Sequence, residues 1–143
     1  MSSYTAPMPD ALTTIDAIIH LSYSLISGPA GQPRDWERFR SLYLPGARLM
    51  PVIGGAQPHV RVLSPEDYIR RVEPIFAVES FYERETSREQ QVIGRFAHVL
   101  SHYESLRDLN SEPFEHGTNS MQLFFDDKRW WFVSVMWNTP RNA

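Results

Sequence analysis

Two histidines and a glutamate in one segment carry the side chains best suited to proton chemistry. His98, His102 and Glu104 lie an even number of residues apart, so in a β-strand they project from the same face. An imidazole, with a pKa of about 6.5, both takes and returns a proton near neutral pH. His98, which has apolar neighbours, is therefore our candidate general base. The alternative is a histidine that is hydrogen-bonded inside a core or an interface.

Metal coordination is the other chemistry that this spacing allows, because ligands on one face of a strand can share an ion. A single strand would supply every ligand, however, and the segment matches no known metal-binding motif. The chain has no cysteine, which excludes thiolate catalysis, disulfides and cysteine-ligated metals. We therefore expect no metal and no cofactor.

Three polar side chains are candidates for contact with a carbonyl group. Tyr23 and Tyr68 lie in segments with helical spacing, and a phenol donates a hydrogen bond to a carbonyl or enolate oxygen. We take Tyr23 as a catalytic candidate and Tyr68 as a ligand-binding one. The amide of Gln122 is a further candidate for orienting a ligand. The alternative for the tyrosines is a core position with only the hydroxyl in water.

Aromatic side chains give the remaining candidates, since indoles suit a flat apolar ligand but also fill cores and dimer interfaces. Trp130 and Trp131 are adjacent in a strand-forming run and must point to opposite faces, so at most one of them lines a pocket. Regular alternation places Trp130, Phe132, Ser134 and Met136 on one face and Trp131, Val133, Val135 and Trp137 on the other. The remaining candidate ligand-binding residues are Trp36, Phe76, Trp130, Ser134 and Met136.

Three helices are predicted in the first half of the chain. Asp10 or Thr14 caps the first, whose apolar residues repeat at intervals of three and four up to residue 26. Asp35 caps a short helix over residues 36–43. The run Ser64-Pro65-Glu66-Asp67 is a strong helix start, and this third helix is expected to extend to about residue 78. Pro74 predicts a kink or a division within it.

Strands dominate the second half. Residues 47–53 and 60–63 form a predicted antiparallel pair, and residues 81–92, residues 95–106 and a hairpin over 117–138 form a predicted four-stranded antiparallel meander. The hairpin turns at Asp126, Asp127 and Lys128. The charged string 83–89 alternates in sign and is interpreted as a solvated sheet face with cross-strand ion pairs. Helices followed by strands indicate an α+β fold with the helices on one face of a curved sheet.

Composition limits the size and partners of this protein. A chain of 143 residues with 42% hydrophobic content suits a single domain over 1–143, in which 1–9 form a flexible lead-in. The net charge of −3 comes from interspersed charges, so we expect no nucleic-acid partner. No apolar run reaches the roughly 18 residues that span a bilayer, and the first residues lack signal-peptide features. We expect no membrane association and a cytoplasmic location.

The order of these segments resembles a known superfamily. The chain reads WERF, LPGARL, SPEDY, FYERE, RFAHVLSHYES, GTNSMQLFF and RWWFVSVMWN. This order, over about residues 10–138, resembles the nuclear transport factor 2-like (NTF2-like) superfamily, also called the SnoaL-like or ketosteroid isomerase-like fold. The resemblance implies a cone-shaped, curved antiparallel sheet wrapped around N-terminal helices, a cystatin-like roll. It also implies an internal pocket and frequent homodimerisation through the outer face of the sheet.

The resemblance leaves two functions open, because the family includes isomerases, cyclases, dehydratases and members that only bind or assemble. The strand ARLMPVI lacks the carboxylate that a steroid isomerase uses as its base, and Ser134 and Met136 stand where many relatives have histidines. We predict a small hydrophobic molecule in an apolar pocket. The protein is either a cofactor-independent isomerase, cyclase or dehydratase of a hydrophobic carbonyl compound, or a non-catalytic ligand-binding or dimerisation module.

Overall fold

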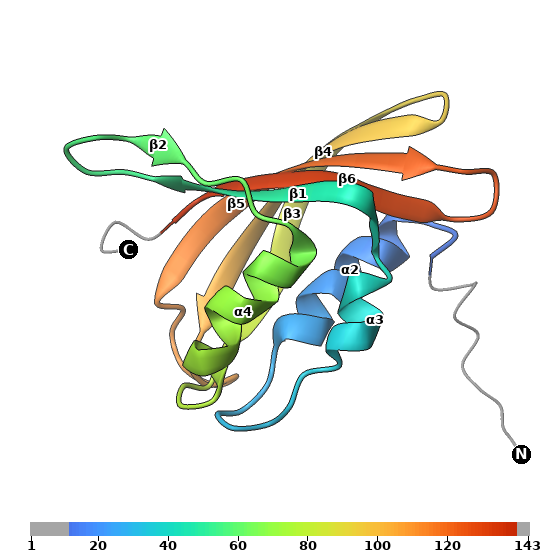
Figure 1. The fold of residues 1–143 in the computed structure, drawn as a ribbon. Helices are drawn as coiled ribbons and strands as arrows, with labels where there is room; N and C mark the ends of the chain where they lie inside the picture. Colours follow the sequence, from blue (N-terminus) through green and yellow to red (C-terminus); the bar gives the residue numbers. More distant parts are fainter. Residues whose placement is uncertain (1–11, 140–143) are drawn as a thin grey trace, which may run out of the picture.

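In the described part of the chain, a six-stranded, strongly curved sheet holds three helices against one of its faces (Figure 1). The computed structural model describes residues 12–139, so the expected lead-in over 1–9 and the alternative cap Asp10 lie outside the described residues. The strand order is β2 (His59–Val60), β1 (Tyr43–Ile53), β6 (Trp130–Asn138), β5 (Glu115–Phe125), β4 (Phe96–Leu106) and β3 (Tyr82–Ile93). This arrangement confirms the α+β fold class.

The helices begin at the caps that the sequence indicates. Helix α2, Ile15–Ile26, starts at Thr14, whose hydroxyl accepts a hydrogen bond of 3.0 Å from the Ala17 amide. Its buried residues repeat at intervals of three and four, so one stripe packs on the sheet. Helix α3, Trp36–Arg40, is capped by Asp35 and is shorter than predicted, because Tyr43 already begins a strand.

Helix α4, Pro65–Phe76, has the predicted capping box at its start. The Ser64 hydroxyl accepts from the Asp67 amide at 3.0 Å, and the Asp67 carboxylate accepts from the Ser64 amide at 3.1 Å. Pro74 does not divide the helix, which runs unbroken to Phe76. Pro74 lies in the last turn, where few backbone hydrogen bonds remain to be lost.

Strands β3 to β6 form the predicted meander, and β1 joins the same sheet beside β6. Strands β3 (Tyr82–Ile93), β4 (Phe96–Leu106), β5 (Glu115–Phe125) and β6 (Trp130–Asn138) pair antiparallel in succession. Strand β1, Tyr43–Ile53, lies parallel to β6 and pairs antiparallel with the short β2, His59–Val60. The sheet is therefore mixed, which corrects the expectation of an antiparallel one. Local pattern does not show which distant strand β1 will join.

The turn of the last hairpin is held by one aspartate. Asp126 accepts hydrogen bonds from the backbone amides of Lys128 and Arg129, both at 2.8 Å, and from the indole of Trp131 at 2.9 Å. Asp127 adopts a left-handed conformation with φ of 78°. These bonds to the ionised carboxylate lower the pKa of Asp126 to about 2.

A bulge in β6 overturns the predicted division of its faces. Gln122 pairs with Ser134 but the next residue, Leu123, pairs with Phe132, so Val133 is an extra residue on the β6 side. The alternation of faces shifts by one position at the bulge. Val135 and Trp137 therefore face the helices together with Trp130 and Phe132, whereas Ser134 and Met136 face outward.

The core lies between the helices and the concave side of the sheet. Phe39 and Phe132 are 1% exposed, and Ile18, Ile19, Leu42 and Val99 are fully buried. No helix in residues 12–139 is both long and apolar enough to cross a membrane.

Candidate functional site

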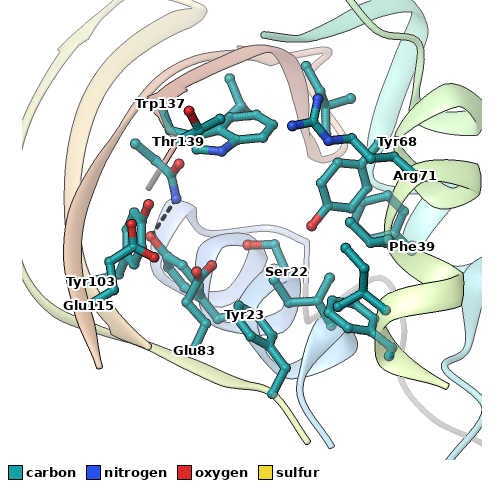
Figure 2. A pocket seen from close by; sticks show the side chains of 18 of the residues that line it. Ser22, Tyr23, Phe39, Tyr68, Arg71, Glu83, Tyr103, Glu115, Trp137 and Thr139 are labelled. Carbon is teal, nitrogen blue, oxygen red and sulfur yellow. Dashed lines mark hydrogen bonds between the residues drawn. The ribbon is translucent and has the colours of Figure 1, made fainter. Parts of the chain in front are cut away.

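A cavity of about 310 Å³ opens between the helices and the concave face of the sheet (Figure 2). Its walls are mostly aromatic and aliphatic, with side chains from α2, α3, α4 and every long strand. The apolar wall includes Ile26, Phe39, Leu49, Val72, Phe76, Phe81, Met121, Phe132, Val135 and Trp137. Such a hollow, whose surface is mainly apolar with several polar side chains among it, is typical of a small-molecule site.

Three carboxyl groups line this cavity, those of Glu79, Glu83 and Glu115. Glu83 projects from β3, and Ser105 on the paired strand β4 donates a hydrogen bond of 3.1 Å to its Oε2. The pKa of Glu83 is raised to about 8, mainly by burial; the Ser105 hydrogen bond opposes this shift and the nearby Glu115 adds to it. Burial also raises the pKa of Glu115. Near neutral pH Glu83 is mainly protonated yet ionises readily, which suits an acid–base group.

Three tyrosines surround the carboxyl groups. Burial raises the pKa values of Tyr23, Tyr68 and Tyr103, so all three remain neutral hydrogen-bonding groups. The charge of Glu83 contributes to the shifts of Tyr68 and Tyr103, which indicates that these phenols and the carboxylate share one electrostatic environment. The Tyr68 hydroxyl points into the cavity (Figure 2).

The position of the Tyr103 ring depends on a glycine of the neighbouring strand. Its ring passes over Gly117 of β5, where a Cβ would collide with the ring carbon and the hydroxyl of Tyr103. Any other residue at this position would displace the phenol. Gly117 thus allows Tyr103 to lie flat along the cavity wall.

A chain of hydrogen bonds runs from the cavity into the sheet. Ser101 donates to Glu85 Oε2 at 2.6 Å, so its single proton is used there. At its 2.7 Å contact with Ser101, Tyr23 must then be the donor. Asn119 in turn donates to the Tyr23 hydroxyl at 3.0 Å, a bond drawn in Figure 2. At the far end, Arg88 forms an ion pair of 2.7 Å with Glu85.

Three of the residues predicted for the site line this cavity. They are Tyr23, Tyr68 and Phe76. Tyr68 stacks on Phe39 with ring centroids 5.5 Å apart, and its ring edge meets Trp137 at 6.0 Å. The three confirmed lining residues all come from predicted helices, whereas none of the candidates on predicted strands lines the cavity.

His98 does not line the cavity. Its neighbours Ala97 and Val99 are fully buried toward the helices, so alternation directs the imidazole to the outer face of the sheet. There His98 Nδ1 lies 2.8 Å from the amide nitrogen of Gln122. The proposed base required an imidazole inside the pocket, and this condition is not met. Gln122, which pairs with His98 across the two strands, lies on the same outer face.

The other predicted site residues also lie outside the cavity wall. Trp36 packs behind it, with its ring edge toward Phe39 at 5.4 Å. Trp130 belongs to the core at the hairpin end and contacts Phe125 at 5.1 Å. Ser134 and Met136 face outward because of the bulge in β6. Local alternation places a residue on a face but does not detect an inserted position.

The histidines and carboxylates first considered for metal binding separate into ordinary outer-face pairs. His102 Nε2 lies 2.7 Å from Glu89, and Glu104 pairs with Arg84 at 2.7 Å. This part of the charged string is a solvated face, as predicted. No group of three His, Asp or Glu side chains in residues 12–139 has a geometry that could hold a metal ion.

Glu83, a polar residue of the predicted meander, was not assigned to the site because it was grouped with that charged face. The structure turns Glu83 and Glu85 inward, whereas Arg84 faces outward. One signal was available: the strand segment opposite carries the uncharged series Ser101, Tyr103 and Ser105, which is typical of a covered face. Carboxylates paired with such residues are candidates for buried ones.

The fold is shared with proteins of known structure. A protein of unknown function with a cystatin-like fold from Nostoc punctiforme superposes with a TM-score of 0.65 at 8% identity over 90% of this chain and 95% of its own. An NTF2-like protein of unknown function from Pseudomonas putida gives 0.64 at 10% identity, over 88% and 84%. A putative calcium/calmodulin-dependent protein kinase II association domain from Xanthomonas campestris gives 0.61 at 14%, over 90% and 87%.

These similarities show the NTF2-like fold that the sequence predicts. No family model matches the chain. No curated protein matches its sequence either. The function must therefore be argued from the cavity, since one fold serves many activities.

Proposed function

We propose that this protein binds a small hydrophobic carbonyl compound in its cavity and catalyses a cofactor-independent proton transfer with Glu83 as the acid–base group. The observation that supports this proposal is a carboxyl group in an apolar cavity with a pKa raised to about 8. A catalytic group works best when its pKa lies near the working pH. Structural ion pairs do not explain the shift, because burial is its main cause.

In the proposed reaction, the Glu83 carboxylate removes a proton from the carbon beside the carbonyl group. The electron pair of that C–H bond forms the enolate, whose oxygen accepts a hydrogen bond from a neutral phenol. Tyr68 is the best placed donor, because its hydroxyl points into the cavity. Protonated Glu83 then returns the proton to another carbon, which completes an isomerisation. In a dehydration it would instead protonate a departing hydroxyl group, which leaves as water.

The predicted catalytic residue Tyr23 receives a different role in this scheme. Its proton is directed to Ser101 and its oxygen accepts from Asn119, so it is not free to donate to a ligand in this arrangement. We assign it a positioning role, in which it joins the floor of the cavity to the sheet. Phe76 and Tyr68 form part of the ligand-binding wall.

The test follows proton transfer directly and requires no knowledge of the natural substrate. 2-Tetralone is an apolar aromatic ketone with acidic C–H groups beside its carbonyl, and NMR in D₂O reports the exchange of these hydrogens. We expect exchange faster than in buffer alone, and a loss of about 100-fold or more in Glu83→Gln. Glu89→Gln, on the outer face of the same strand, is the matched control and should keep the wild-type rate.

Two results would contradict the catalytic proposal. Unchanged exchange in Glu83→Gln would remove Glu83 from the reaction. Binding of 2-tetralone without accelerated exchange would favour the alternative, a non-catalytic ligand-binding or assembly module. The similarity to a putative kinase association domain supports that second candidate at the level of the fold. The predicted cytoplasmic location and homodimer accompany both candidates as proposals.

A further inference from the structure

Two arginines border the cavity, and their surroundings differ. Arg107 forms an ion pair of 2.9 Å with Glu79 and lies over the ring of Phe114, 4.1 Å from its centre. Arg71 projects from α4 and turns into the cavity on the side of Tyr68 (Figure 2). Its Nη1 is buried and has no hydrogen-bond partner among residues 12–139.

An enclosed guanidinium nitrogen without an acceptor is costly. Taking part of a cation out of water loses hydration energy that only a hydrogen bond or an opposite charge restores. Two acidic residues of the helical side are already paired: Glu79 with Arg107, and Asp67 with Arg70 at the start of α4. The acceptor that Arg71 lacks is therefore expected from outside the described chain.

The outer side of Arg71 also favours an anion. A second groove, which shares Arg71 with the cavity, is lined by Arg61, Arg70, Arg71 and Asp67 together with two apolar residues. Asp67 is its one acidic group, and this carboxylate is already used by Arg70 and Ser64. The local charge is therefore positive, which attracts an anionic ligand toward the cavity and repels a cationic one.

We propose that Arg71 binds the anionic end of the ligand, a carboxylate or a similar oxyanion carried by an otherwise apolar, aromatic molecule. This inference deepens the proposed function, on which it rests for the occupancy of the cavity, by naming the substrate class as a hydrophobic acid. A guanidinium matches the planar pair of oxygens in such a group. Glu83 stands across the same cavity, so one molecule would meet Arg71 with its charge and Glu83 with its reacting carbon.

A pair of fluorescent probes tests the proposal. 1-Anilinonaphthalene-8-sulfonate is an aromatic anion, and N-phenyl-1-naphthylamine is the same skeleton without the sulfonate group. We expect the anionic probe to bind the wild-type protein more tightly than the neutral one. Arg71→Met should weaken the anionic probe at least tenfold and change the neutral one less than twofold. Arg71→Lys, which keeps the charge, should recover part of the loss.

Arg95→Met is the matched control, because Arg95 lies between β3 and β4, outside the cavity and the groove, and is exposed and paired with Asp127. It should leave both affinities within twofold of the wild type. Thermal unfolding of each variant confirms that the fold is kept. Glu83→Gln should retain the Arg71-dependent preference, which separates this inference from the proton-transfer mechanism.

The other outcomes overturn the proposal. Equal loss of both probes in Arg71→Met would mean that the side chain only packs against the cavity wall. Equal affinity of the two probes for the wild type, or no binding of the anion, would show that the guanidinium recognises no negative charge.

Discussion

At the scale of single residues, Glu83 illustrates how a surrounding cavity changes the chemistry of a common side chain. A glutamate in water has a pKa of 4.5, and in this cavity the value is about 8. The single hydroxyl of Ser105 does not replace the lost hydration of the carboxylate. The same burial that suits Glu83 for catalysis must therefore reduce the stability of the folded protein above its ordinary pKa.

The stability of this protein should fall with pH because of Glu83. Between the unfolded pKa of 4.5 and the folded value of about 8, the unfolded chain has released the proton while the folded protein still holds it. Rising pH therefore favours unfolding across that window. Glu83→Gln should stabilise the protein at pH 9 relative to pH 5 by an extra amount on the order of 3 kcal/mol.

Urea unfolding at the two pH values measures this difference. Glu89→Gln, on the outer face, is the control, and its dependence on pH should stay below about 1 kcal/mol, because its exposed pair with His102 is weak. An equal effect of Glu83→Gln at pH 5 and pH 9 would contradict the raised pKa.

At the scale of elements, the position of the cavity wall depends on irregularities in two strands. The bulge in β6 turns Val135 and Trp137 toward the helices, and a register shift between Glu85 and Ser87 alters β3. Gly117 removes one side chain so that Tyr103 can cross it. Each irregularity replaces simple alternation where the sheet bends around the pocket.

Replacing Gly117 should disturb the cavity through Tyr103. In Gly117→Ala the new methyl group occupies the position of the Tyr103 ring, so the ring must move or the strands must separate. We expect a loss of about 1–3 kcal/mol in the free energy of unfolding and weaker binding of apolar probes. Gly54→Ala is the matched control, since its Cβ meets no atom and its φ is not in the left-handed region. Equal stability of the two variants would contradict the proposed contact.

At the scale of the whole molecule, the sheet has two faces with different surroundings. The concave face meets the helices and the cavity, and the outer face carries His98, His102, Gln122 and Met136. Homodimerisation through that outer face stays a prediction. Met136 supports this prediction, because it is an apolar side chain that is 37% exposed on that face.

Sedimentation tests the dimer. Met136→Glu should weaken association at least tenfold, because a twofold axis places the new charges of both subunits in one interface. Val78→Glu makes the same kind of change at a residue that is 74% exposed beyond α4, and should leave association unchanged. A wild-type protein that sediments as a monomer at all concentrations would contradict the prediction.

The sequence alone determined the elements and their order. Thr14, Asp35 and Ser64 mark helix starts through hydrogen bonds to amides a few residues away, and Asp126 closes the last hairpin in the same local way. Such signals act over three or four residues, so they can be read from the chain. The helical spacing of Tyr23, Tyr68 and Phe76 likewise predicted residues that line the cavity.

Only the tertiary structure decided which polar groups share the cavity. His98 and Glu83 both lie in strands of alternating character, and the side on which the helices pack separates them. The inserted residue Val133 and the parallel pairing of β1 with β6 depend on the curvature of the complete sheet, which local sequence does not encode. The raised pKa of Glu83 and the Arg71 Nη1 that has no partner in residues 12–139 both depend on burial, which exists only after distant segments have packed together.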